Sequence, residues 1–177
     1  MEGIQNNISR EKVYTNGFIT IEKVNFDREG FESYSHLRVV KRDAVAGILY
    51  NKATDKYIFI KQYRTGTDSF LTEVIAGTMD VPGEAAEDCF AREIEEESGY
   101  EMTYAELICV SHTTPGVCNE KINLFYAETD GKKTGTGGGV GHEQLEIVEL
   151  SFEEVLANSH LLNDMKTCAA IFYLINK

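Results

Sequence analysis

The sequence predicts an α/β protein in which helices cover a sheet of mixed strands. Short runs of β-branched and aromatic residues, separated by turn residues, fill the first third of the chain. The strongest helical pattern lies near the middle, at 84–98, and more strand-like runs and two helical segments follow it. Many strands with few helices are typical of one sheet with helices packed on it. The 177 residues are enough for one domain of ordinary size.

Turn residues mark where the strands of the N-terminal part begin and end. Asn16 and Gly17 tolerate positive φ and stand between two strand-like runs, which is the pattern of a two-residue hairpin turn. A second turn is expected at 28–30 and a third at 51–55. The strands expected before the central helix are 13–15, 18–21, 31–40, 44–50, 56–62 and 71–75.

The helices are predicted from apolar spacing and from their end signals. The segment 84–98 contains no Gly or Pro, has apolar residues at helical spacing, and is followed by Gly99 at the C′ position. Further strands are expected at 104–111, 121–128 and 144–150. Ser151 and Glu154 form a capping-box pattern that begins a short helix. A last helix, at about 164–175, carries an apolar side made of Met165, Cys168, Ala169, Phe172 and Ile175.

Charge and hydropathy exclude several function classes. The 17 Lys and Arg against 29 Asp and Glu give a net charge of −12. Such a surface repels phosphate backbones, so we expect no nucleic-acid partner. No apolar run approaches the ~18 residues of a membrane-spanning helix, and the first residues lack a stretch of signal-peptide type. We therefore expect no membrane partner and a cytoplasmic location.

Crowded carboxylates occupy the last turns of the central helix. At 100° per residue, Glu93, Glu96 and Glu97 share one face and Glu95 points away. Like charges at these spacings repel, by about 3 kcal/mol for two carboxylates ~6 Å apart at an effective dielectric of ~20. The C-terminal end of a helix carries partial negative charge, which makes the location still less favourable.

Two interpretations of this acidic cluster are open from the residues alone. It is either a solvated acidic face, screened by salt and by Arg92, or a site where a divalent cation removes the repulsion. Mg²⁺ suits the second interpretation, because hard cations take oxygen ligands and Mg²⁺ also bridges to substrate phosphates.

A short motif around the cluster resembles a known family. Residues 92–100, Arg-Glu-Ile-Glu-Glu-Glu-Ser-Gly-Tyr, resemble the end of the Nudix box, Arg-Glu-aliphatic-x-Glu-Glu-x-Gly-aliphatic. Glu84 lies at the box spacing before Arg92, and Gly77 resembles the opening glycine, although one residue more than in the family separates it from Glu84. The resemblance makes Gly77, Glu84, Arg92 and Gly99 structural positions of the box, and implies that Glu84 pairs with Arg92. It also implies a Nudix α/β/α sandwich with a mixed sheet.

Segments on both sides of the box narrow the resemblance. Gln62-Tyr63-Arg64 and residues 73–77 before it, and Thr114-Pro115-Gly116 after it, are similar to the nucleoside-diphosphate-sugar branch, which includes ADP-ribose pyrophosphatases and GDP-mannose hydrolases. The resemblance also implies an N-terminal antiparallel strand extension over 1–41, before a Nudix domain over 42–177. In relatives such an extension commonly forms a homodimer and completes the partner's site, so we expect a homodimer.

Carried over to this sequence, the resemblance implies a metal site at the acidic cluster. Glu93 and Glu97 are the expected ligands of Mg²⁺, for which Mn²⁺ can substitute. Glu96 is expected among the catalytic residues, either as a further ligand or beside the ligands. The backbone carbonyl of Ala76 is expected to add another oxygen.

The resemblance also assigns residues to the substrate and to proton transfer. Arg64 is expected to contact the nucleotide or its phosphates, where a planar guanidinium suits bidentate contact. Glu73 is expected to hydrogen-bond the nucleoside end or to position its neighbours. The general base is expected to be Glu143 or Glu146, and Glu143 is preferred because it follows a glycine-rich segment, 135–141, that is able to move.

The resemblance implies Mg²⁺-dependent hydrolysis of a nucleoside diphosphate sugar, of ADP-ribose or GDP-mannose type, to a nucleoside monophosphate and a sugar phosphate. Two alternatives are open. One is a Nudix hydrolase of dinucleoside polyphosphates or modified nucleoside triphosphates. The other is a non-catalytic module that senses nucleotide sugars.

Overall fold

The computed structural model describes residues 7–27, 30–139 and 144–177. The chain divides into two compact units, one made of Met1–Arg42 and His112–Lys121 and the other of Asp43–Ser111 and Ile122–Lys177. The segment His112–Lys121, which links β8 (Tyr104–His112) and β9 (Lys121–Thr129), thus groups with the N-terminal residues. In the part of the chain that is described, no helix combines the length and apolar character that crossing a membrane requires.

The N-terminal unit contains a three-stranded sheet. β1 (Ile8–Thr15), β2 (Thr20–Phe26) and β3 (Tyr34–Val40) pair antiparallel in sequence order. The predicted antiparallel strand extension is therefore confirmed. Among the described residues of these strands, Val24 is the one apolar side chain that is buried. The sheet leaves most of its apolar side chains at least partly exposed.

The turn between β1 and β2 differs from the predicted one. The last strand pair is Thr15 with Thr20, which leaves 16–19 in the loop rather than two residues. The Asn16 side chain accounts for the difference, because its Oδ1 accepts hydrogen bonds from the backbone N–H groups of Phe18 and Ile19 at 3.2 and 2.9 Å. This is the local bonding by which Asn replaces a backbone turn. Gly17 takes the positive φ, 91°.

The larger unit is built on a mixed sheet. Its strands follow the order β10-β5-β4-β9-β8. The central strand β4 runs parallel to β9 and antiparallel to β5, and β10 is antiparallel to β5. The bounds are β4 Ala44–Asn51, β5 Lys56–Arg64, β8 Tyr104–His112, β9 Lys121–Thr129 and β10 Glu146–Leu150. All five lie within a few residues of their predicted positions.

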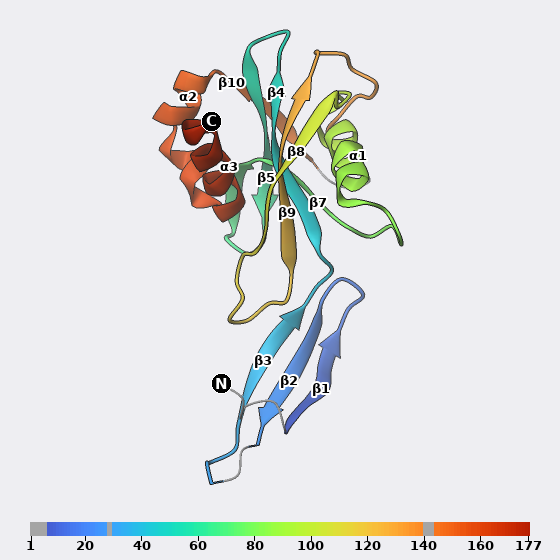
Figure 1. Ribbon diagram of the computed structural model, residues 1–177, viewed down its shortest axis with the longest axis vertical. Helices are drawn as coiled ribbons and strands as arrows, with labels where there is room; N and C mark the ends of the chain where they lie inside the picture. Colours follow the sequence, from blue (N-terminus) through green and yellow to red (C-terminus); the bar gives the residue numbers. More distant parts are fainter. Residues whose placement is uncertain (1–6, 28–29, 140–143) are drawn as a thin grey trace. The chain divides into compact units, whose positions relative to one another are not determined.

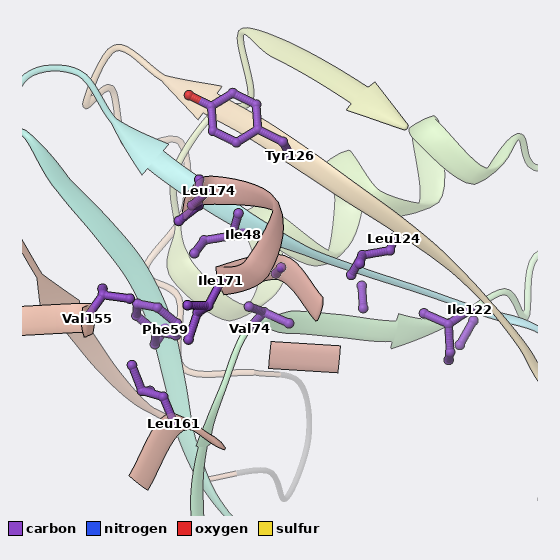
Figure 2. Close-up of a cluster of buried hydrophobic side chains, with 13 residues drawn as sticks. Ile48, Phe59, Val74, Ile122, Leu124, Tyr126, Val155, Leu161, Ile171 and Leu174 are labelled. Carbon is purple, nitrogen blue, oxygen red and sulfur yellow. The ribbon is translucent and has the colours of Figure 1, made fainter. Parts of the chain in front are cut away.

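Helices cover both faces of this sheet (Figure 1). Alternate residues of β4 pack into the two apolar clusters on opposite faces of the sheet, since successive side chains of a strand point to opposite faces. Val45 and Leu49 pack with Phe90 and Ile94 of α1 (Ala86–Ser98). Ile48, on the opposite face, belongs to the cluster that includes α2 (Phe152–Ala157), the short helix η1 (Ser159–Asn163) and α3 (Met165–Asn176). Figure 2 shows this second cluster. The predicted α/β/α sandwich is confirmed.

The strand predicted at 71–75 is two strands with different partners. β6 (Ser69–Glu73) pairs with β5, whereas β7 (Ile75–Thr78) pairs with β4. The change of partner occurs at Val74, whose backbone N–H donates to Thr167 Oγ1 of α3 at 3.0 Å instead of joining a sheet ladder. The sheet therefore splits beside two of the predicted site residues, Glu73 and Ala76.

The last helix does not bury the side that its apolar pattern marks. Phe172 is 70% exposed and Met165 is 71% exposed. The buried residues of α3 are instead Thr167, Ala170, Ile171 and Leu174, and Figure 2 shows Ile171 and Leu174 within the apolar cluster beneath the helix. A helix with apolar residues on both sides gives no periodic signal that selects the packed side.

Candidate functional site

The helix α1 carries the acidic cluster and ends as predicted. Gly99 adopts the left-handed conformation, with φ of 76°, and its N–H donates to the carbonyl of Glu95. The helix begins at Ala86, two residues later than the pattern indicates, and its N-cap, Ala85, makes no side-chain hydrogen bond. Glu87 and Asp88 lie in the first turn, where their negative charges interact favourably with the positive end of the helix dipole and stabilise the start of the helix.

The acidic face of α1 is turned into the protein. Glu97 is only 6% exposed and the side chain of Glu93 only 12%, whereas Glu95 is exposed. The side chain of Glu96 is intermediate, at 33%. The backbone N–H of Ala76 lies 3.4 Å from Glu97 Oε2, so Glu97 reaches β7 across the helix–sheet boundary. A solvated acidic surface does not describe these side chains, because two of the three carboxylates are shielded from water.

Glu93 is a carboxylate in an environment that disfavours its charge. Burial raises the pKa of Glu93 above its ordinary value, and the nearby Arg92 opposes this shift. Arg92 Nη1 lies 2.8 Å from Glu93 Oε1 and 3.3 Å from Glu96 Oε2. One guanidinium therefore serves two carboxylates of the cluster, and the negative charge is only partly balanced.

Gly77 of β7 makes room for the Glu93 carboxylate. A Cβ atom on Gly77 would lie 1.9 Å from Glu93 Cδ and 2.2 Å from each carboxylate oxygen. Any side chain at this position would therefore displace the carboxylate. The opening glycine of the motif is thus required by the packing of Glu93 against β7.

Arg92 and Glu84 form the pair that the motif implies. Arg92 Nε lies 3.1 Å from Glu84 Oε1 and Nη2 lies 3.2 Å from Oε2, a bidentate geometry. The extra residue between Gly77 and Glu84 is accommodated in a turn, where Glu84 N–H donates to the carbonyl of Val81 at 3.2 Å. The loop before α1 is therefore held to the helix in spite of the insertion.

The donor chemistry of the acidic face fits a hard cation. Glu93 and Glu97 offer carboxylate oxygens from one side of α1, beside the backbone of Ala76. Mg²⁺ and Mn²⁺ accept such all-oxygen sets. Within the described residues, no three His, Cys, Asp or Glu side chains are already gathered in a metal-binding arrangement. The described residues thus supply carboxylate ligands suited to Mg²⁺, but they do not form a complete coordination site by themselves.

A second charged group lies at the split in the sheet. Glu73 is 2% exposed and accepts a 2.5 Å contact from Arg64 Nε. Lys166 Nζ, from the first turn of α3, lies 3.3 Å from the other Glu73 oxygen and 2.7 Å from Asp164. The structure thus brings the predicted Arg64 and Glu73 together and adds Lys166, which the sequence reasoning missed. Its only signal in the sequence is its place after Asp164, the N-cap of α3.

The two candidate general bases differ in what the structure describes. Glu143 lies outside the described residues. Glu146 begins β10, its side chain is 66% exposed, and it forms an ion pair with Lys61 at 2.9 Å. The glycine-rich segment before them, expected as a loop able to move, is bound to α1 in its described part. The N–H groups of Gly138 and Gly139 donate to the carbonyls of Glu97 and Glu96 at 2.9 and 3.1 Å.

A family model matches the part of the chain that forms this site. The model of the NUDIX domain matches residues 40–167. The chain belongs to the Nudix family. The resemblance drawn from the box is therefore confirmed, and the match contains the acidic face, the split at Val74 and the contact from Lys166.

Relatives of this Nudix protein match nearly its whole length. A GDP-mannose pyrophosphatase from Cronobacter sakazakii is 30% identical over 178 residues, which cover 93% of this chain and 92% of the relative. A GDP-mannose pyrophosphatase from Salmonella typhimurium is 29% identical with the same coverage. The crystal structure of an ADP compounds hydrolase covers 96% of this chain and 92% of its own, with a TM-score of 0.79 and 22% identity. That structure confirms the fold.

Proposed function

We propose that this Nudix protein is a Mg²⁺-dependent pyrophosphohydrolase of nucleoside diphosphate sugars, of the GDP-mannose or ADP-ribose type. The products are a nucleoside monophosphate and a sugar phosphate. The observation that carries the proposal is the burial of Glu93 and Glu97 on one face of α1, against β7. The full-length similarity to proteins named GDP-mannose pyrophosphatases supports the choice of substrate class.

The acidic face and the split in the sheet have separate tasks in this reaction. Glu93 and Glu97, with Glu96 beside them and the Ala76 carbonyl, would hold Mg²⁺. When bound there, Mg²⁺ would supply charge neutralisation on the diphosphate and would activate water. Arg64 binds the nucleotide or its phosphates, and its position is set by the buried Glu73, which Lys166 also contacts. The substrate is thus oriented by residues of β5, β6 and α3.

We assign proton transfer to a glutamate that follows the acidic helix in the chain, as the resemblance implies. Water attacks one phosphorus of the diphosphate, the bond from that phosphorus to the bridging oxygen breaks, and the bridging oxygen leaves with the other phosphate. Glu143 takes the proton of the attacking water. Glu146 is the second choice, because its exposed side chain is engaged by Lys61.

The test compares two helix variants on a substrate panel. Purified protein is incubated with Mg²⁺ or Mn²⁺ and GDP-mannose, ADP-ribose, diadenosine polyphosphates or modified nucleoside triphosphates, and phosphate-monoester products are quantified. Glu97→Gln should abolish turnover with an unchanged circular dichroism spectrum. Glu95→Gln is the matched control, since this exposed side chain lies on the same helix and should keep wild-type turnover.

Each outcome of the panel has a definite meaning. Release of a nucleoside monophosphate and a sugar phosphate supports the proposal. Preference for diadenosine polyphosphates or triphosphates assigns the protein to a different Nudix activity. Binding of nucleotide sugars without turnover on any substrate makes it a sensing module. Unchanged turnover in Glu97→Gln removes the role given to the acidic face.

We also propose that residues 1–41 form a dimerisation element of a cytoplasmic homodimer, in which the Nudix domain spans 42–177. Large side chains of the N-terminal strands and turns are exposed, with Phe18 at 89%, Leu37 at 60% and Tyr14 at 57%. Exposed apolar groups of this kind are typical of an interaction surface. Light scattering coupled to size exclusion should give twice the mass of 19.8 kDa, and Leu37→Glu should shift the protein toward monomer.

A further inference from the structure

The C-terminal end of α1 is closed by residues 137–139, which we name the capping segment. The last four carbonyls of a helix have no partner within it. Here the backbone carbonyl of Glu95 accepts a hydrogen bond from the N–H of Gly99. The carbonyls of Glu96 and Glu97 accept hydrogen bonds from the N–H groups of Gly139 and Gly138. The capping segment therefore binds the backbone of two residues of the acidic cluster directly, from a part of the chain far away in sequence.

Only glycine permits this contact. Gly137 has φ of +64°, and a Cβ atom there would lie 2.7 Å from the carbonyl carbon of Ser98 and 2.9 Å from the carbonyl oxygen of Glu97. These are backbone atoms of the helix end, which cannot rotate aside as a side chain can. Gly99 is equally confined, because its Cβ would lie 2.6 Å from the carbonyl oxygen of Gly135.

The contact also changes the electrostatics of the helix end. The C-terminus of α1 carries partial negative charge on its free carbonyls, and it lies beside Glu93, Glu96 and Glu97. Two backbone N–H groups from the capping segment place positive dipole ends at that position. They offset part of the repulsion that makes this location unfavourable for carboxylates.

We propose that the capping segment is a positioning element of the metal site. It fixes the backbone of Glu96 and Glu97, so that the carboxylates of α1 are held ready for Mg²⁺. This inference rests on the proposed function, since it requires the acidic face to bind Mg²⁺. Coupling between two sites is reciprocal. Disturbing the capping segment therefore weakens metal binding, and bound metal stabilises the capping contact.

Three glycine substitutions separate the effects of backbone strain and of collision. Gly137→Ala introduces both a disfavoured φ and a clash with α1. Gly138→Ala introduces only the disfavoured φ, +94°, with no atom within 4 Å of the new Cβ. Gly135→Ala is the matched control, because its φ is ordinary and its nearest contact, 3.5 Å to the Glu95 carbonyl oxygen, is a normal one.

Binding of Mn²⁺ alone, without nucleotide, is measured on each protein by electron paramagnetic resonance. Gly137→Ala should weaken binding by about tenfold or more, as loss of a supporting contact around a metal site commonly does. Gly138→Ala should show a smaller loss, and Gly135→Ala should match wild type. If Gly137→Ala does not fold, the comparison of Gly138→Ala with Gly135→Ala decides in its place.

Amide hydrogen exchange on the wild type gives a readout independent of mutation. Saturating Mg²⁺ should slow exchange of the Gly138 and Gly139 amides. Unchanged exchange, or equal Mn²⁺ affinity in the substituted and control proteins, overturns the positioning role and leaves the proposed function intact. A wild type that binds neither Mn²⁺ nor Mg²⁺ overturns the proposed metal site, and the positioning role with it.

Discussion

The carboxylate of Glu93 lies in the space that a side chain on Gly77 would need. A Cβ on Gly77 would meet Glu93 Cδ at 1.9 Å, although the two residues belong to different elements, β7 and α1. The packing of this one carboxylate against a bare backbone joins the start of the motif to its acidic end. It also gives a means of moving a proposed metal ligand without altering its chemistry.

Gly77→Ala is expected to lower activity and Mg²⁺ affinity by about 10–100-fold, the usual size of such losses around metal sites. The thermal midpoint should change little, because the colliding atoms are the far end of a flexible side chain that can rotate away. Steady-state kinetics and a thermal melt check the two parts of this prediction. Gly66→Ala is the control, since nothing lies within 4 Å of its Cβ. Full activity in Gly77→Ala would contradict the assignment of Glu93.

The stability of the metal-free protein is expected to depend on pH through Glu93. Burial raises the pKa of Glu93 in the folded protein, whereas in the unfolded chain it titrates near its ordinary value of about 4.3. The folded state thus binds more protons between these two pKa values. The free energy of unfolding contributed by Glu93 therefore falls as pH rises through this window and is level above it.

Urea denaturation of wild type and Glu93→Gln in EDTA, from pH 4 upward, checks this dependence. Subtracting the free energy of unfolding of the variant from that of the wild type cancels the contribution of the other carboxylates. As pH rises, the variant should become more stable relative to the wild type. Saturating Mg²⁺ should reverse the order at neutral pH, because only the wild type retains the ligand. A wild type that gains on the variant with rising pH in EDTA would show that Arg92 outweighs burial.

Lys166 is expected to contribute to stability through the buried Glu73. Removing one partner from a buried ion pair leaves the other charge without compensation. Because Lys166 remains 17% exposed and Glu73 keeps Arg64, we expect Lys166→Met to cost about 1–3 kcal/mol. A double-mutant cycle with Glu73→Gln, followed by urea denaturation, measures the coupling. Additive effects of the two substitutions would mean that the contact is energetically neutral.

The two sides of α3 are expected to respond differently to truncation. Ile171 is 4% exposed, so Ile171→Ala should cost about 2–5 kcal/mol. Phe172 is 70% exposed, so Phe172→Ala should change the free energy of unfolding by about 0.5 kcal/mol or less. Denaturation curves at low protein concentration compare the two. A large loss for Phe172→Ala would indicate that this side of the helix is covered by another molecule.

The most local features were the most predictable from sequence. The helix of the motif, its glycine end and the capping box at Ser151 follow from residues close together in the chain, and the structure contains all three. The side of α3 that is buried was not predictable, because both sides are apolar. The split strand also escaped prediction, since the partner of the Val74 N–H is Thr167, 93 positions away.

The candidate site shows the same limit. The pairing of Arg92 with Glu84 follows from a spaced motif, and the structure contains it. The approach of Lys166 to Glu73 depends on how α3 docks on the sheet, and no spacing in the chain encodes it. The position of Gly77 was predictable from the motif, but the reason for a glycine there is the volume occupied by Glu93, which depends on how α1 packs on β7.

The hydrogen bond from the Val74 N–H to Thr167 Oγ1 limits how far this protein can be shortened at its C-terminal end. The family match stops at residue 167, one residue after Lys166, whereas α3 continues to Asn176 and buries Ile171 and Leu174. A fragment that ends with the match would retain Lys166 and Thr167. It would lose the buried part of α3 whose packing holds these two residues in place. Truncation designs should therefore preserve the carboxy-terminal helix to its end, even though most of its length falls beyond the recognisable family.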